Sequence, residues 1–257
     1  MMLHELGSDP AKDAIYLAAG SNPSIATNPH QIPVIVTVPG SKYSFAIVKY
    51  DVQNEVEIFA ASSAELKPQT RKDFIACGEY LINEKYAAKN KLAGIGVSAG
   101  GITIGRAVTD RPDLFVAAFP VVGVLDMLRS ESTANGASNI PEYGTVKDEV
   151  GFKALREMST YDHIKNGTEY PAILLYHGYN DPRVDVWMSA KAGARLQAAT
   201  TSGKPVLLDI DYESGHGIGN TSAQSIRRTT DLLSVMLWQL GDPEFQPAEK
   251  TESAKKE

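Results

Sequence analysis

The chain has 257 residues, a net charge of −6 and 43% hydrophobic residues, which fits one large globular domain or one domain with an appendage. The acidic balance and the lack of a basic stripe argue against a nucleic-acid-binding protein. The single cysteine, Cys77, excludes an internal disulfide framework and is expected to be a packed thiol. With neither a signal-peptide pattern nor an apolar run of about 18 residues, the default expectation is a cytoplasmic protein.

The first 65 residues contain four short runs that are apolar or alternate between apolar and polar residues. They span residues 14–17, 32–38, 44–50 and 55–60. Turn residues such as Pro39-Gly40-Ser41 separate them, as is typical of a β-meander. Residues 1–65 are therefore interpreted as an N-terminal β-strand segment.

From residue 66 the pattern changes to alternating helices and strands. Helices are predicted at 70–84, 102–108, 186–199 and 223–240, and strands at 91–95, 115–123, 172–178 and 205–212. Strands that are apolar throughout and alternate with helices predict a mostly parallel sheet covered on both faces. The predicted fold class is α/β, with one domain over 66–242 and a polar tail over 243–257.

The run Gly96-Val97-Ser98-Ala99-Gly100-Gly101 lies between a predicted strand and a predicted helix. A G-x-S-x-G string in this context is typical of a nucleophile elbow, whose sharp turn leaves no room for larger side chains. The sequence therefore predicts Ser98 as a nucleophile and the backbone N–H of Ala99 as a donor to an oxyanion. The alternative is a tight turn that carries an ordinary exposed serine.

A serine hydroxyl needs a general base, and the base needs an orienting carboxylate. In α/β-hydrolases the acid and then the base follow the serine along the chain, in loops after later strands. Asp181 follows the strand predicted at 172–178, and His216 follows the strand predicted at 205–212. Asp181 is therefore the candidate acid and His216 the candidate base.

Several alternatives compete with these roles. Asp181 also has good turn neighbours in Asn180 and Pro182, and Asp185 is a rival acid, whereas Asp209 and Asp211 fall inside a predicted strand. The remaining histidines are His4, His30, His163 and His177. They do not form a metal-ligand spacing, so we expect neither a metal nor a cofactor. His177 ends a strand and could line the site, but packing is favoured. Arg183 could pair with a carboxylate or with substrate, and a structural salt bridge is favoured.

Seven stretches are distinctive beyond these local patterns. They are Asp73-Phe74 with Glu79-Tyr80-Leu81-Ile82, Gly96 to Gly101, Arg111-Pro112-Asp113-Leu114-Phe115, Val122 to Leu128, Glu142-Tyr143-Gly144, His177-Gly178 with Asp181 to Val184, and Gly215-His216-Gly217. Together they resemble the catalytic domain of the prolyl oligopeptidase family of serine peptidases. The resemblance implies an α/β-hydrolase fold with the triad Ser98, Asp181 and His216, and it places Asn139, Tyr143 and Arg183 at substrate-binding positions.

Residues 5–65 resemble a short piece of the family's β-propeller. The resemblance implies that most of the propeller and the front of the hydrolase domain, including a tyrosine that helps to bind the oxyanion, are absent. A second oxyanion donor must then come from elsewhere, and losing one typically costs about 10²–10³ in rate. The strand before Ser98 would also have an exposed edge. We expect strands within 32–60 to cover this edge, or two chains to pair there as a homo-oligomer.

The substrate expectation rests on residues 137–141. The family's proline specificity uses an aromatic residue in the corresponding stretch, and this chain has none there. Activated esters need less transition-state stabilisation than amides, so the first hypothesis is a serine hydrolase that forms an acyl-enzyme and acts as a carboxylesterase on short acyl chains. The second is a prolyl oligopeptidase-like peptidase that cleaves short peptides. The third is a non-catalytic remnant that serves as a binding or assembly module.

Overall fold

A computed structural model describes residues 2–5, 33–37, 43–48, 68, 70–217 and 219–248. Four parallel strands form its centre and lie side by side in chain order. They are β4 (Leu92–Val97), β5 (Ala117–Val121), β6 (Ala172–Gly178) and β7 (Val206–Asp211). Each lies within two residues of a predicted strand, so the predicted α/β class with a parallel sheet is confirmed.

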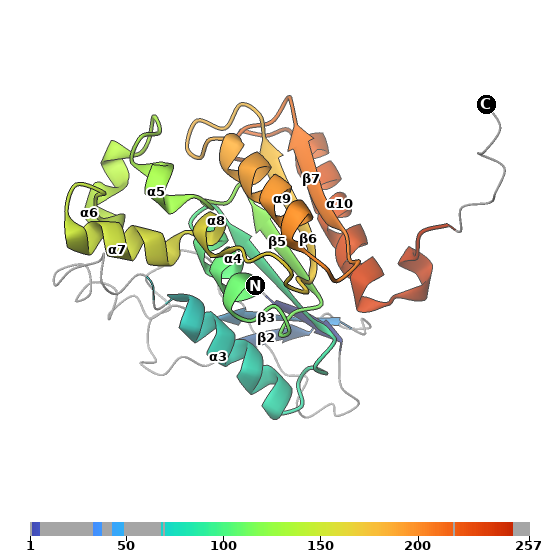
Figure 1. The fold of residues 1–257 in the computed structure, drawn as a ribbon. Helices are drawn as coiled ribbons and strands as arrows, with labels where there is room; N and C mark the ends of the chain where they lie inside the picture. The colour runs from blue at the N-terminus through green and yellow to red at the C-terminus, as the bar shows by residue number, and fades with distance from the viewer. Residues whose placement is uncertain are drawn as a thin grey trace.

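Helices cover both faces of this sheet (Figure 1). Three of them, α3 (Thr70–Asn83), α4 (Gly100–Asp110) and α9 (Trp187–Ala199), pack on one face, and α10 (Ser222–Leu240) packs on the other. Along β6, Ile173 and Leu175 point into the first core, whereas Leu174 and Tyr176 point toward α10. β5 and β6 are buried along their whole length, which explains their mostly apolar sequences, whereas β7 is partly exposed and contains Asp209 and Asp211.

Helix α10 has clear boundary signals. Thr221 and Gln224 form a capping box at its start, and Gly241, with a φ of 82°, ends it. The short 3₁₀ helix η4 (Pro243–Phe245) follows, so the first residues of the predicted tail have regular structure. No helix in the described part of the chain is long and apolar enough to cross a membrane.

The N-terminal strands extend the sheet beyond β4. β2 (Pro33–Thr37) and β3 (Tyr43–Val48), two of the predicted strands, pair antiparallel. β1 (Met2–Glu5), which was not predicted, lies between β3 and β4 and runs antiparallel to both. A meander is not shown, because β1 separates β3 from β4 and the strands predicted at 14–17 and 55–60 lie outside the described residues. The strand that pairs directly with β4 is β1 rather than one within 32–60.

Short helices fill the connection between β5 and β6, and the sequence patterns did not predict them. They are α5 (Met127–Ser130), η3 (Ala137–Asn139), α6 (Ile140–Tyr143), α7 (Glu149–Met158) and α8 (Thr160–His163). Figure 1 shows α5, α6 and α7 together at the left of the sheet. Met127, Tyr143 and Leu155 bury themselves there against Ile102 of α4, so this group of helices has its own small core.

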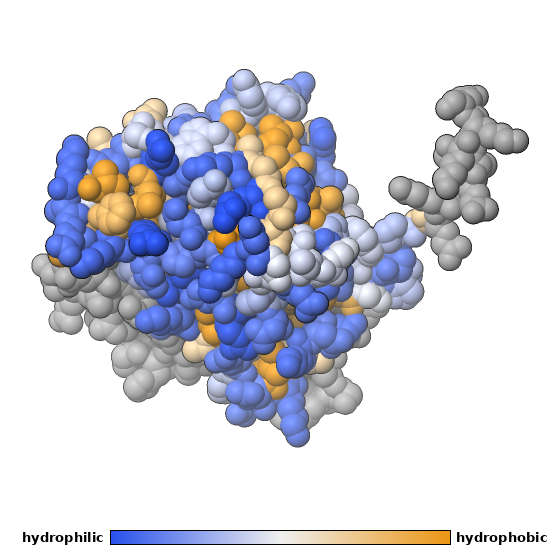
Figure 2. All heavy atoms as spheres, viewed as in Figure 1, coloured by the Kyte–Doolittle hydropathy of each residue, from blue (hydrophilic) through white to orange (hydrophobic). Residues whose placement is uncertain are grey.

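An apolar patch lies over α6 and α7 on the surface seen in Figure 2. The exposed large apolar side chains of this region are Val146, Val150 and Phe152. Exposed apolar residues that gather in one place mark candidate interaction surfaces.

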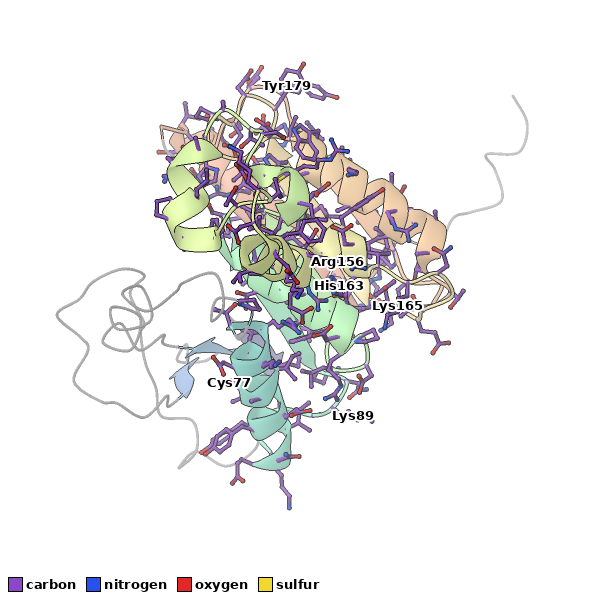
Figure 3. All side chains as sticks on the ribbon, turned by 60° about the vertical axis from the view of Figure 1, so that its left-hand side comes forward. Cys77, Lys89, Arg156, His163, Lys165 and Tyr179 are labelled. Carbon is purple, nitrogen blue, oxygen red and sulfur yellow. The ribbon has the colours of Figure 1, made fainter. Side chains whose placement is uncertain are left out.

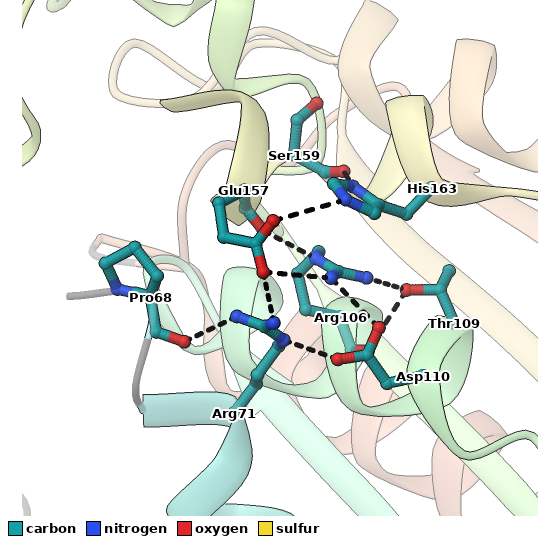
Figure 4. Close-up of polar contacts among 8 residues, drawn as sticks. All are labelled: Pro68, Arg71, Arg106, Thr109, Asp110, Glu157, Ser159 and His163. Carbon is teal, nitrogen blue, oxygen red and sulfur yellow. Dashed lines mark hydrogen bonds and ion pairs between the residues drawn. The ribbon is translucent and has the colours of Figure 1, made fainter. Parts of the chain in front are cut away.

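A charge network built on two buried arginines joins four helices (Figure 4). Arg106 of α4, which is 1% exposed, pairs with Asp110 at 2.9 Å and donates its Nε–H to the Glu157 backbone oxygen at 2.7 Å. Arg71 of α3 pairs with both Asp110 and Glu157. His163, at the end of α8, lies 3.6 Å from the Glu157 carboxylate. The network therefore fixes α4, the helix that follows Ser98, to α3, α7 and α8.

Candidate active site

Ser98 sits in a strained turn between β4 and α4. Its φ is 57°, in the left-handed region that residues other than glycine rarely adopt. The Ser98 N–H donates to the Val121 oxygen at 2.9 Å, and the Ser98 oxygen accepts from the Val124 N–H at 3.1 Å. These two hydrogen bonds, one to the last residue of β5 and one to the loop after it, hold Ser98 in a conformation that costs about 1–3 kcal/mol.

The glycines around Ser98 are required by close backbone contacts. A Cβ on Gly96 would lie 2.1 Å from the Gly100 oxygen, and a Cβ on Gly101 would lie 2.4 Å from the Gly123 Cα. Both contacts involve backbone atoms, which cannot rotate away. A Cβ on Gly100, in contrast, would meet nothing within 4 Å.

We therefore expect Gly101→Ala to lower the free energy of unfolding by about 2–3 kcal/mol, because the added methyl group forces α4 away from Gly123. Gly100→Ala is the matched control and should be neutral or slightly stabilising, since alanine favours helix. Urea unfolding of both variants measures the difference. Equal midpoints for the two variants would contradict the proposed contact.

The structure brings Ser98, His216 and Asp181 into one hydrogen-bonded chain. His216 Nε2 lies 2.9 Å from Ser98 Oγ, and His216 Nδ1 lies 2.7 Å from Asp181 Oδ2. The His216 side chain is 8% exposed and that of Asp181 is fully buried, while Ser98 is partly exposed. A carboxylate only accepts hydrogen bonds, so His216 carries its proton on Nδ1 and leaves Nε2 free to accept the serine proton.

Asp181 is held as a carboxylate. Burial raises its pKa, but hydrogen bonds from His177 and His216 and from the N–H groups of Val184 and Arg183 outweigh burial and hold the pKa well below its usual range. The two backbone bonds reach Oδ1, at 2.8 Å from Arg183 and 3.0 Å from Val184. The predicted turn chemistry is thus also present, and it serves to orient the acid.

The loops that carry the acid and the base are tied together. The Asn180 N–H donates to the Ser214 oxygen at 3.0 Å, and Asn180 Nδ2 donates to the Tyr212 oxygen at 2.9 Å. The rings of Tyr179 and Tyr212 lie 5.3 Å apart. Figure 3 shows Tyr179 at the opposite end of the molecule from Lys89. The contacts keep Asp181 within reach of His216.

The rival acids have other partners. Asp185 accepts from Trp187 Nε1 at 3.0 Å, and Asp211 accepts from the Tyr176 hydroxyl at 3.3 Å. Asp209 lies on β7, as predicted. His177 is fully buried, as expected, but it also lies 3.3 Å from Asp181 Oδ2, a contact that sequence reasoning missed. From the sequence, its position two residues after Leu175 in β6 indicates only on which face of the sheet its side chain lies.

The backbone N–H of Ala99 lies at the N-terminus of α4. Neither this group nor the N–H of Gly100 is bonded to another described residue. Free N–H groups at a helix start, with the positive end of the helix dipole, favour a negative charge beside them. The predicted oxyanion donor is therefore available next to Ser98.

The predicted substrate residues are placed differently from one another. Asn139 ends η3 and is half-buried. Tyr143 is 6% exposed in the small core with Met127 and therefore offers little surface to a substrate. Arg183 is exposed, and no described carboxylate pairs with its guanidinium, so the salt-bridge expectation is wrong for the described residues. Cys77 is buried on α3, as expected, and burial raises the pKa of its thiol.

Comparison with known proteins agrees with this geometry. The family model described as "Prolyl oligopeptidase family" matches residues 59–242, well over half of the chain. The chain belongs to this family. The resemblance found in the sequence is thus confirmed, and the fold is that of a serine hydrolase. The described residues hold no group of three or more His, Cys, Asp or Glu residues that could bind a metal ion.

Individual members of the prolyl oligopeptidase family are similar over the same region. A prolyl endopeptidase from Elizabethkingia miricola is 40% identical over 182 residues, which is 70% of this chain and 26% of that protein. A prolyl endopeptidase from Dictyostelium discoideum is 34% identical over 68% of this chain and 23% of its own length. The structure of prolyl oligopeptidase B from Galerina marginata superposes with a TM-score of 0.66 at 30% identity, covering 69% of this chain and 25% of the other. The chain thus spans about a quarter of the relatives it matches.

Proposed function

We propose that the protein cleaves short peptides through an acyl-enzyme. Ser98 attacks the carbonyl carbon, His216 takes the serine proton and returns it to the leaving amine, and Asp181 orients His216. The Ala99 N–H stabilises the negative oxygen of the intermediate. The observation that carries the proposal is the unbroken hydrogen-bond chain from Ser98 Oγ through His216 to Asp181, set on a strained elbow.

Family membership favours peptides over the esters that the sequence argument ranked first. The curated relatives described above are named as prolyl endopeptidases, not carboxylesterases. A short-chain ester remains the second candidate, because residues 137–141, which include Asn139, contain no aromatic side chain. Esters also tolerate an oxyanion site with fewer donors, since their leaving group is better than an amine.

A direct comparison of substrates tests both candidates. Wild type and Ser98→Ala are assayed with a prolyl amide substrate and with p-nitrophenyl acetate and butyrate. We expect wild type to hydrolyse the prolyl amide with a higher kcat/KM relative to background than it shows for either ester, and Ser98→Ala to fall to background with all three. Ester turnover without amide turnover would support the carboxylesterase. Equal turnover by Ser98→Ala would exclude the acyl-enzyme mechanism.

Labelling by a fluorophosphonate separates an enzyme from a non-catalytic binding module. We expect rapid labelling of Ser98, whereas a module without catalysis would label slowly or not at all. Exposed apolar side chains near α6 and α7, among them Val150 and Phe152, are a candidate surface for such a module. Association of two copies through a sheet edge, and a cytoplasmic location, stay predictions. Light scattering on dilution measures the first of them.

A further inference from the structure

His177 lies beside the acid of the triad and has no part in the mechanism above. It is the penultimate residue of β6, and its side chain and that of Asp181 are both fully buried. His177 Nε2 lies 3.3 Å from Asp181 Oδ2, the same oxygen that lies 2.7 Å from His216 Nδ1. Two imidazole rings therefore converge on one carboxylate oxygen.

The surroundings of His177 select one tautomer. Its Nε2 lies 2.9 Å from the Val184 backbone oxygen, and a carbonyl oxygen only accepts, so Nε2 carries a hydrogen. In the neutral ring Nδ1 is then an acceptor, and the hydroxyl of Ser189 on α9 lies 2.7 Å from it as the donor. Nε2 therefore donates to the Val184 oxygen and also lies 3.3 Å from Asp181 Oδ2.

We propose that His177, held in this tautomer by the Val184 carbonyl and bonded to Ser189, is a positioning residue for Asp181. Its Nε2–H fixes Oδ2 in the orientation that meets the Nδ1–H of His216. The inference rests on the proposed function of the triad. A chain of close polar contacts then runs from α9 to the nucleophile through Ser189, His177, Asp181, His216 and Ser98.

Two donors on each oxygen keep the carboxylate from turning. The backbone N–H groups of Arg183 and Val184 hold Oδ1, and the two imidazoles hold Oδ2. When His216 takes the proton of Ser98, the new positive charge needs the carboxylate to stay ionised and in place. His177 exchanges no proton in this step. It supplies a fixed donor, and that donor also favours the charged form of a buried acid.

Two substitutions at His177 separate positioning from packing. His177→Leu keeps a buried apolar side chain but removes the donor, and we expect kcat to fall about 10- to 100-fold with KM unchanged, because a hydrogen bond to a charged group is lost. His177→Gln should keep kcat within about threefold, because its amide N–H₂ can replace Nε2–H and its oxygen can accept from Ser189. Ser189→Ala should lower kcat by about two- to fivefold, since Val184 still selects the tautomer.

Proton NMR of the resting protein gives a readout that does not depend on turnover. The strongly deshielded His216 Nδ1–H signal should shift or vanish in His177→Leu and return in His177→Gln. A packing role alone predicts the reverse order, with leucine tolerated and glutamine harmful, and would overturn the inference, as would an unchanged signal in His177→Leu. If His177→Leu does not fold, Ser189→Ala decides: an unchanged kcat and signal would then overturn it. If a fluorophosphonate does not label Ser98 in the wild type, but the His216 Nδ1–H signal still changes in His177→Leu, the proposed function is rejected and the positioning role of His177 stands.

Discussion

Asp181→Asn is expected to lower kcat by about 10⁴-fold, as removal of the charge from a triad acid does when the geometry stays intact. All four polar contacts to the carboxylate come from groups that can donate: the N–H groups of Arg183 and Val184 at Oδ1, and the imidazoles of His216 and His177 at Oδ2. An asparagine amide must direct its N–H₂ group at one of these pairs. If it faces His216, it donates to Nδ1 and moves the imidazole proton to Nε2, which then cannot accept the proton of Ser98.

The measurement is kcat with the best substrate found, together with the rate of Ser98 labelling by a fluorophosphonate. Asp185→Asn is the matched control. It lies four residues further along the same loop, and its partner, Trp187 Nε1, donates equally well to an amide oxygen. The control should retain kcat within about twofold, since it does not contact His216. Retention of a tenth or more of the activity by Asp181→Asn, or an equal loss in Asp185→Asn, would show that Asp181 is not the acid.

The pKa direction at Asp181 has a consequence for the pH dependence. Because the pKa lies below that of an unfolded aspartate, about 3.9, the group contributes stability above that pH, and the contribution disappears as the pH falls through the lower, folded value. Asp181 is therefore ionised wherever a histidine base titrates. The acid limb of the rate profile is then not expected to report Asp181.

The triad could be predicted because each part of it has a local signal. Glycines flank Ser98, and Asp181 and His216 each follow an apolar strand, so the rule that parallel strands end at one edge of the sheet brings them together. The requirement for glycine at Gly96 and Gly101 follows from the same sharp turn around Ser98. The pattern favoured Asp181 over Asp185, but the loop path that puts Asp181 beside His216 is seen only in the structure.

The contacts of His177 illustrate the limit more sharply. Alternation along β6 places it on the same face as Leu175, the face covered by α9. Its contact with Asp181, however, depends on the chain turning back over the strand end, and its contact with Ser189 depends on the register of α9. Neither is encoded in spacing along the sequence.

The short helices between β5 and β6 escaped prediction for another reason. Three of them, α5, α6 and α8, have four residues each, about one turn, which is too short for a helical period to appear. Helices α5 and α6 are stabilised because Met127 and Tyr143 bury against α4 and α7, and Asp126 caps α5 by accepting from the Arg129 N–H. Tyr143 was assigned to substrate from a motif, and its place in this core could not be foreseen.

Arg106→Met is expected to lower the free energy of unfolding by about 3 kcal/mol, because it removes the buried guanidinium that pairs with the partly buried Asp110. Arg106 is 1% exposed and bonds to Asp110 and to the Glu157 backbone. Methionine fills a similar volume but leaves those acceptors with fewer donors. Arg111→Met is the matched control, since its side chain is 35% exposed and its pairing with Asp113 at 2.8 Å faces solvent. The control should cost no more than about 1 kcal/mol.

Acidification separates a charge effect from a simple loss of packing. Burial raises the pKa of Asp110, but hydrogen bonds and charges from Arg71 and Arg106 outweigh it and hold the pKa below its usual range. The stability that Asp110 contributes is therefore present above the unfolded pKa of about 3.9 and is lost as the pH falls through the folded value. Urea unfolding should show that the difference in the free energy of unfolding between wild type and Arg106→Met becomes smaller from pH 7 to pH 3. A gap of constant size would mean that Arg106 stabilises α4 by packing, not by charge.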